Sequence, residues 1–249
     1  MNKQTAFLTW QDPDSRDWHV IGVLEYEKEQ YSFRYTQGSK ATNNFVPFSG
    51  MENLTKEYKS SGLFPVFQNR LLSSKRPEFP KFISWLGLNP ETANNMDVLT
   101  RSGGVRGTDN LQLFPKIELG SNGEFEHVFF VHGVRYLPDS AQQRIDALKS
   151  GDALYACLDI QNEFDNNAVL LRTQNPPELL GYVPRYLSTE LFSILKKDQN
   201  SMCFHVEQIS NEAPESYKLL CRVTGRLSTE LQNSFMAGQE YQPLTDQGN

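Results

Sequence analysis

The sequence predicts an α+β protein, in which a small N-terminal sheet-and-helix domain is followed by a β-barrel of about six strands with two helices. Two observations lead to this prediction. Helical and strand periodicities are mixed before about residue 118, whereas short strand-like runs dominate after it. The polar segment Glu118–Glu124, which contains Gly120 and Gly123, separates the two patterns and is the expected domain boundary.

The N-terminal part shows a mixed pattern of strands and helices. Strands are expected at residues 19–26, 31–35 and 111–114, and helices at 64–72, 79–86 and from about 89 to 101. The third helix is expected to begin with Asn89 as its N-cap, because Pro90 suits the first helical turn. It is expected to end at Gly103-Gly104, since glycine favours helix termini.

The C-terminal part consists mostly of short apolar runs separated by Gly, Asn-Asn or Pro-Pro. Strands are expected at residues 128–134, 153–160, 168–172, 179–183, 203–209 and 217–223, and helices at 142–148 and 186–195. From Asn233 onward the polar, Gln-rich chain is expected to be frayed. The predicted division is therefore residues 1–120 and 125–226, with a tail at 227–249.

Composition limits the kinds of function. The chain has 249 residues and a formal net charge of −6, from 24 Lys+Arg and 30 Asp+Glu. Proteins that coat nucleic acids by bulk electrostatics are usually basic, so nucleic-acid binding would require a local pocket. The N-terminus has no secretion signal, and no apolar run is long enough to span a membrane. We therefore expect a soluble, cytoplasmic protein.

The cysteines and histidines do not form a metal-binding or catalytic pattern. Cys157, Cys203 and Cys221 are far apart and lie in apolar runs, which predicts buried free thiols and neither a disulfide framework nor a zinc site. The four histidines are dispersed, and no nucleophile motif is present. Asp165 with Asp159 and Glu163 could hold Mg²⁺ in a nuclease, but their alternation along the chain is weak evidence. We expect no enzyme activity, cofactor or metal.

Three motifs in the C-terminal part occur in a fixed order. They are Gly-Val-Arg-Tyr at residues 133–136, Asn-Glu-Phe-Asp-Asn-Asn-Ala-Val at 162–169 and Gly-Tyr-Val-Pro-Arg at 181–185. Together they resemble the HIRAN family, a β-barrel module that captures single-stranded DNA ends. The resemblance implies a HIRAN-type barrel and a DNA-binding site at Arg135, Tyr136, Asn162, Phe164, Asp165, Tyr182 and Arg185.

The chemistry of these residue types agrees with that role. Aromatic rings stack on bases, and arginine binds phosphate with its planar fork, so Tyr136 would stack and Arg135 and Arg185 would hold phosphates. In the family an aromatic-Asp pair captures the 3′ end, and the resemblance gives this role to Phe164 and Asp165. A carboxylate accepts a hydrogen bond from a free 3′-OH. The alternative is structural: a tight turn at residues 162–167, with Phe164 as a core plug and Tyr136 in the barrel wall.

The N-terminal part resembles the N-terminal subdomain of HipA-type serine/threonine kinases. The residues that carry this resemblance are those at 21–24, 31–35, 67–72, 101–104 and 109–115. No kinase core follows them. The resemblance implies an antitoxin-like, regulatory partner of a HipA-like kinase, which is the alternative to a non-catalytic protein that captures single-stranded DNA ends.

One loop of the N-terminal part is a candidate anion-binding site. Arg101, Gly103, Gly104 and Arg106 could form a nest of backbone N–H groups beside two guanidinium groups. The alternative is an ordinary helix C-terminus, at which Arg101 would be favourable.

Overall fold

A computed structural model describes residues 3–244 of the chain, which divide into two compact units. The first unit contains the described residues up to Ile83, the segment Leu88–Lys116 and the segment from Met236 onward. The second unit contains Ser84–Gly87 and Ile117–Phe235. The domain bounds that the sequence indicates remain a prediction.

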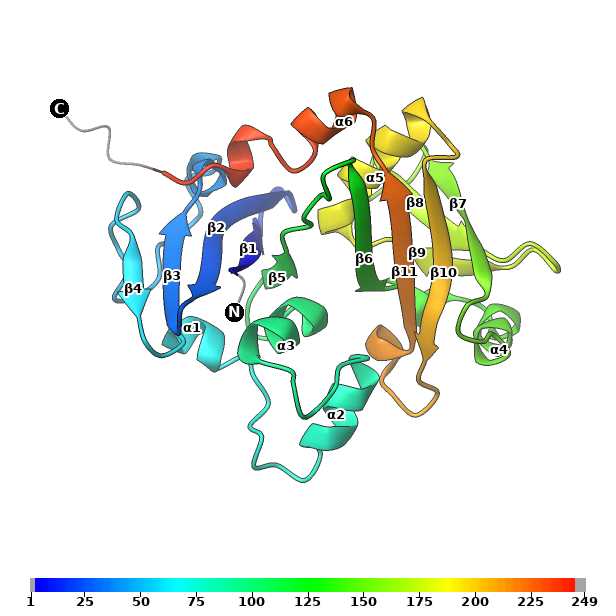
Figure 1. Cartoon of the computed structure of the whole chain (residues 1–249), viewed down its shortest axis with the longest axis horizontal. Helices are drawn as coiled ribbons and strands as arrows, with labels where there is room; N and C mark the ends of the chain where they lie inside the picture. The colour runs from blue at the N-terminus through cyan, green and yellow to red at the C-terminus, as the bar shows by residue number, and fades with distance from the viewer. Residues whose placement is uncertain (1–2, 245–249) are drawn as a thin grey trace. The chain divides into compact units, whose positions relative to one another are not determined.

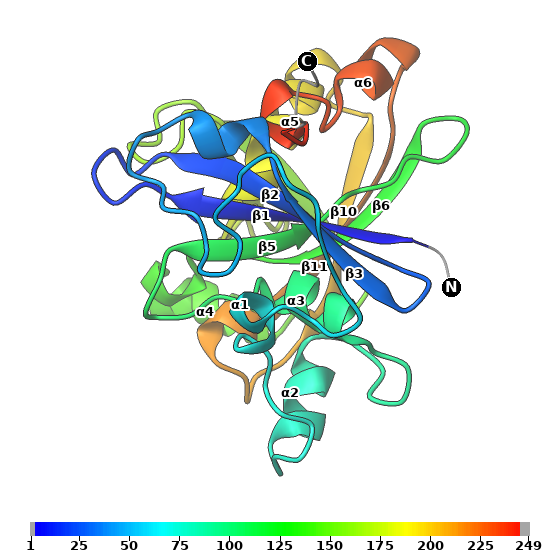
Figure 2. The same ribbon diagram turned by 90° about the vertical axis from the view of Figure 1, so that its left-hand side faces the viewer.

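The first unit is built on a five-stranded antiparallel sheet in the order β4-β3-β2-β1-β5. Its strands are β1 (Gln4–Gln11), β2 (Trp18–Glu27), β3 (Gln30–Tyr35), β4 (Tyr58–Ser60) and β5 (Leu111–Pro115). Figure 2 shows β2, β1 and β5 side by side. The hairpin between β2 and β3 turns at Lys28-Glu29, and both residues have the positive φ that a tight two-residue hairpin loop requires.

The helical segments of the first unit are short. They are η1 (Gln37–Lys40), α1 (Pro65–Gln68), α2 (Phe79–Trp85), α3 (Asn95–Ser102) and η4 (Gln239–Tyr241), and the last two residues of α2 are assigned to the second unit. Phe67 of α1 and Leu99 of α3 pack with Phe33 of β3 in one buried hydrophobic cluster. Burial of these apolar side chains against the sheet holds short helices that would be unstable alone.

Several expectations for this unit were wrong. The helix expected at residues 64–72 stops at Gln68, and the helix expected from Asn89 begins after Asn94. Asn94 forms a capping box with Asp97, whereas Asn89 accepts a hydrogen bond from the Glu91 backbone within a turn. Strands β1 and β4 were not predicted. Four consecutive residues of β1 are buried, so the strand lacks the alternation of buried and exposed positions on which strand prediction depends. Strand β4 has only three residues, too few for a recognisable pattern.

The second unit contains a six-stranded antiparallel sheet in the order β6-β11-β10-β7-β8-β9. Its strands are β6 (Glu124–Phe130), β7 (Ala153–Asp159), β8 (Ala168–Arg172), β9 (Leu179–Tyr182), β10 (Met202–Ile209) and β11 (Leu219–Arg226). Its helices are η2 (Val134–Tyr136), α4 (Asp139–Asp146), α5 (Arg185–Lys197), η3 (Glu215–Tyr217) and α6 (Thr229–Ser234). Six strands are present as predicted, five of them close to the expected bounds, and α4 and α5 correspond to the two predicted helices.

The edges of this sheet meet and curl it into a partly closed barrel. His132, just after β6, and Tyr182 in β9 exchange backbone hydrogen bonds of 2.8 Å in both directions. Figure 1 shows β6, β11 and β10 side by side with β9 behind them, as expected for a sheet that curves back on itself. Gly181 permits this approach: its φ is +119°, and a Cβ atom there would lie 2.3 Å from the His132 carbonyl oxygen.

The strand expected at residues 128–134 is shifted. The first strand of the second unit begins at Glu124 and ends at Phe130, and residues 134–136 form the short helix η2 instead. Gly133 starts that helix with a φ of +84°. The shift turns Arg135 and Tyr136 out of the sheet and places them on a projecting turn.

The C-terminal segment was expected to be frayed from Asn233, and this is wrong as far as Leu244. The Leu244 N–H donates to the Tyr35 carbonyl, and the Gln37 N–H donates to the Gln242 carbonyl. Leu244 is buried within the hydrophobic cluster of the first unit. The apolar residues in this mostly polar stretch therefore tie it to the sheet.

The expectation of three buried thiols also needs correction. Cys221 is buried, Cys157 is partly exposed and Cys203 is exposed. The strand alternation explains the difference, because Cys203 and Cys157 point to the outer face of the curled sheet, whereas Cys221 points inward. Burial raises the pKa of the Cys221 thiol.

Candidate functional site

The loop between β7 and β8 is fixed by the side chain of Asn162. Its Oδ1 accepts hydrogen bonds from the backbone N–H groups of Phe164, at 3.0 Å, and Asp165, at 3.1 Å. Its Nδ2 donates to Asp159 Oδ2 at 3.0 Å. An Asn in this arrangement replaces the backbone hydrogen bonds that the turn lacks. The turn of the structural alternative is therefore present, and it gives the next two residues a defined direction.

Two aromatic side chains on this unit project into solvent. Phe164 is 83% exposed and Tyr136 is 74% exposed. The Phe164 carbonyl accepts a hydrogen bond from Arg185 Nη1, so its backbone is held although its ring is free. The structural interpretations of Phe164 as a core plug and of Tyr136 as a barrel-wall residue are thus wrong. Exposed rings on fixed backbone are available for stacking.

The Asp165 carboxylate is held between the loop and α5. Its Oδ1 accepts from the Asn167 N–H at 2.9 Å, and its Oδ2 accepts from Ser188 Oγ at 2.7 Å. Ser188 lies one turn after Arg185 on the same helix and is fully buried. Each carboxylate oxygen can accept a second hydrogen bond, so Asp165 keeps acceptor capacity while its orientation is fixed.

Asp159 links the loop to β9. Its Oδ2 accepts from Tyr182 Oη at 2.9 Å as well as from Asn162. The hydrogen bonds from Asn162 and Tyr182 lower the pKa of Asp159. Burial and the hydrogen bond to Asp159 raise the pKa of Tyr182. Asp159 is therefore ionised at neutral pH, and Tyr182 is a neutral donor.

Arg135 and Tyr136 form a pair of their own on η2. The Arg135 guanidinium lies over the Tyr136 ring, 4.5 Å from its centroid, and donates a hydrogen bond to the Tyr136 hydroxyl. The turn that carries them starts next to the bridge between His132 and Tyr182. Hydrogen bonds, one of them through Asp159, join the other five predicted site residues: Asn162, Phe164, Asp165, Tyr182 and Arg185.

Two residues of this cluster were missed as binding-site residues from sequence. Asp159 was considered only as a metal ligand, and Ser188 was not considered. Ser188 follows the Gly-Tyr-Val-Pro-Arg motif by three residues, which places it on the same helical face as Arg185. A search for polar residues one turn into that helix would have found it.

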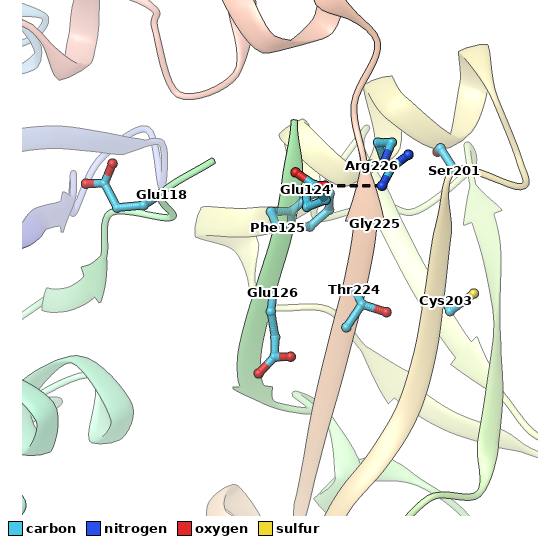
Figure 3. A pocket seen from close by; sticks show the side chains of 9 residues that line it. All are labelled: Glu118, Glu124, Phe125, Glu126, Ser201, Cys203, Thr224, Gly225 and Arg226. Carbon is cyan, nitrogen blue, oxygen red and sulfur yellow. Dashed lines mark hydrogen bonds and ion pairs between the residues drawn. The ribbon is translucent and has the colours of Figure 1, made fainter. Parts of the chain in front are cut away.

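A hollow elsewhere on this unit has the wrong charge for nucleic acid. An open hollow of about 700 Å³ lies at the end of β6, β11 and β10, and Figure 3 shows the side chains that line it. Glu118, Glu124 and Glu126 supply three carboxylates, whereas the only cation in the lining is Arg226, whose guanidinium pairs with Glu124 at 3.1 Å. Phosphates would be repelled here.

In the first unit, the candidate anion-binding loop has the geometry of a helix end. Gly103 is the left-handed C-cap of α3, and its carbonyl accepts from the Leu113 N–H. The Gly104 N–H donates to Ser102 Oγ, and its carbonyl accepts from Arg70 Nη1. This favours the alternative interpretation, and an anion site that includes Arg101 and Arg106 remains a prediction.

Within residues 3–244, no group of three or more His, Cys, Asp or Glu side chains is arranged to hold a metal ion. In the same part of the chain, no helix is both long enough and apolar enough to cross a membrane.

Comparison with known proteins identifies the second unit. Residues 125–228 match the HIRAN domain family. A crystal structure of a protein from Lactobacillus plantarum is similar with a TM-score of 0.32 and 21% identity, covering 41% of this chain and 97% of that one. The crystal structure of the HIRAN domain of human HLTF has a TM-score of 0.35 and 16% identity, covering 48% of this chain and 86% of that one.

The HIRAN assignment rests on the family match, because the two structural likenesses are too weak to add to it. No curated protein matches the chain significantly. The HIRAN resemblance is thus confirmed for residues 125–228. The HipA resemblance of the N-terminal part has no support in any of the comparisons.

Proposed function

We propose that the HIRAN domain of residues 125–228 is a non-catalytic module that captures the 3′-OH end of single-stranded DNA. One observation carries the proposal: Phe164 is 83% exposed on a backbone that Asn162 and Arg185 hold in place. A large apolar ring in solvent has no stabilising role in the fold, but it offers a stacking surface for a base.

The neighbouring groups fit the remaining parts of a strand end. Arg185 and Arg135 are exposed and can each bind a phosphate. Asp165 is fixed beside Phe164 and retains lone pairs for a donor. A terminal 3′-OH is a hydrogen-bond donor, whereas a 3′-phosphate brings like charge. The arrangement therefore favours an unphosphorylated 3′ end.

The test compares oligonucleotides that end in 3′-OH and 3′-phosphate by fluorescence anisotropy. The wild-type chain should prefer the 3′-OH end by about 1–3 kcal/mol, the range for a hydrogen bond to a charged group or for a polar group left unpaired. Asp165→Asn should bind both ends with similar affinity, because the amide lacks the charge that discriminates between them. Glu163→Gln is the matched control, since it removes the same charge from an exposed position of the same loop.

Two results would contradict the proposal. If the wild-type chain binds both ends equally, Asp165 has only the role of a turn residue. If Glu163→Gln abolishes the preference as completely as Asp165→Asn does, the discrimination comes from the net charge of the loop and not from a placed carboxylate.

A further inference from the structure

One face of the strands β7, β8 and β9 continues from the candidate end-binding site. Cys157 pairs with Leu170 and Leu170 pairs with Tyr182, so these three side chains lie on the same face of the sheet. Tyr155 of β7 and Arg172 of β8 are directly opposite each other. Each lies two residues from the Cys157–Leu170 pair along its strand, so both side chains are on the same face. The face is the outer one, since the alternate residues Leu154, Val169 and Leu171 are buried.

At the far end of this face, Tyr155 and Arg172 form an aromatic-cation pair. The Arg172 guanidinium lies 5.3 Å from the centroid of the Tyr155 ring, and Tyr155 is 40% exposed. Arg172 donates to the Thr173 carbonyl at 3.0 Å, and in the described part of the chain it has no ion pair with a carboxylate. By contrast, Arg222 is paired with Glu207 at 2.7 Å. The charge of Arg172 is therefore available to a phosphate.

The separation of this pair from the end-binding loop suits a nucleic-acid strand. Tyr155 and Asp159 are four residues apart on β7, which corresponds to about 13 Å at the rise of a strand. Phosphates of one stacked strand are about 3.4 Å apart along its axis, so this length corresponds to at most about four nucleotides. An extended strand covers it with fewer.

We propose that Tyr155 and Arg172 form a second binding position for single-stranded DNA, a few nucleotides to the 5′ side of the captured end. The proposal rests on the proposed function, because the strand must first be held at the loop of residues 160–167. Tyr155 stacks on a base, and Arg172 binds the neighbouring phosphate. Between the two positions the strand crosses Cys157 and Leu170, which offer a partly apolar floor.

The first test uses a dinucleotide and an octanucleotide, both with a free 3′-OH. Tyr155→Ala and Arg172→Ala should each weaken octanucleotide binding about tenfold, a typical effect of losing one stacked base or one phosphate contact. Neither variant should change the affinity for the dinucleotide, which is too short to reach the pair. Arg226→Ala is the matched control: it removes an exposed arginine from β11, near the acidic hollow, and should change neither affinity.

The second test uses the wild-type chain and therefore does not depend on a variant that folds. Cys157 lies on the proposed path, whereas Cys203 is exposed on β10 beside the acidic hollow. The octanucleotide should slow modification of Cys157 by a thiol reagent and leave the rate at Cys203 unchanged. The dinucleotide should protect neither thiol.

The outcomes separate this inference from the function on which it rests. If both oligonucleotides bind with equal affinity and Cys157 reacts at the same rate with either, end capture stands and the second position is wrong. If the octanucleotide protects Cys203 instead, the strand follows another face and the second position is again wrong. If neither oligonucleotide binds, both proposals fail.

Discussion

Phe164 is a large apolar side chain that the fold leaves in solvent while fixing its backbone from two sides. Phe164→Ala should weaken single-stranded DNA binding by about 1–3 kcal/mol, because one base loses its stacking partner. The free energy of unfolding should change little, since the ring contributes almost nothing to the core. Anisotropy and chemical denaturation measure the two quantities.

Two control variants separate an effect on binding from an effect on stability. Phe164→Tyr keeps the ring and should retain binding, whereas Phe129→Ala removes a buried ring and should lower stability by about 3–5 kcal/mol. A Phe164→Ala variant that is as unstable as Phe129→Ala would mean that the ring is part of the core after all.

Asp12 in the first unit is a buried carboxylate with several donors. It accepts from Thr42 Oγ1 at 2.6 Å, from Asn44 Nδ2 at 3.1 Å and from the backbone N–H of Asp14 at 2.8 Å. The hydrogen bond from Thr42, with help from the others, lowers the pKa of Asp12 from its ordinary 3.8 to about 2. The folded state therefore binds this proton less readily than the unfolded state does.

Such a group stabilises the fold above its unfolded pKa, and the contribution is lost as pH falls through the folded pKa. Asp12→Asn should therefore lower the denaturation midpoint at neutral pH, and the difference from wild type should shrink between pH 3.8 and about 2. Denaturant titrations across that range measure it. Asp17→Asn, at an exposed position nearby, should have little effect at any pH; an equal loss there would assign the effect to net charge.

At the scale of secondary structure, the first residue of α3 is set by its N-cap, Asn94. Asn94 accepts from the N–H groups of Met96 and Asp97, and the Asp97 carboxylate accepts from the Asn94 N–H. Asn94→Ala should cost about 1 kcal/mol of stability, the usual effect of losing an N-cap. Asn89→Ala is the control, because Asn89 looked like the cap in the sequence. A larger loss at Asn89 would show that the helix starts there.

The start of α3 could be predicted only in part from the sequence. Pro90 and Glu91 match a helix start at Asn89, but a capping box requires an acidic residue or Gln three positions after the cap. That position is Thr92 after Asn89 and Asp97 after Asn94, so the capping-box pattern favours Asn94. A tertiary contact supports the same start, since Asn94 also donates a hydrogen bond to Gln4 of β1. The strands of the barrel were easier to predict because apolar and polar residues alternate along them.

The residues of the candidate site could be predicted from the sequence, but the side chains that contact them could not. The order of the three motifs pointed to Phe164 and Asp165, but their surroundings depend on a helix that follows later in the chain. Ser188 contacts Asp165 from 23 positions away in sequence. The exposure of Tyr136 depends on a strand ending at Phe130 instead of 134, and sequence patterns locate such boundaries poorly.

At the scale of the whole molecule, the first unit is discontinuous in sequence. Besides backbone hydrogen bonds to Tyr35 and Gln37, the C-terminal segment contributes Tyr241, whose ring packs 4.9 Å from that of Phe7. A chain truncated after Phe235 should therefore lose stability in the first unit while the HIRAN domain is unaffected.

Hydrogen exchange measures the stability of each unit separately. Amides of β2 and β3 should lose protection in the truncated chain, whereas those of β10 and β11 should not. The full-length chain is the control. Loss of protection in β10 and β11 after truncation would mean that the segment also supports the HIRAN domain.

The discontinuity also sets an order of events during synthesis. Domains generally fold as they leave the ribosome, and the N-terminal one usually folds first. Here the HIRAN domain is complete once Phe235 has emerged, whereas the first unit still lacks the residues that pair with Tyr35 and Gln37. The unit that begins earlier in the chain is thus the last to finish folding, and the nascent chain carries a folded HIRAN domain before the first unit is complete.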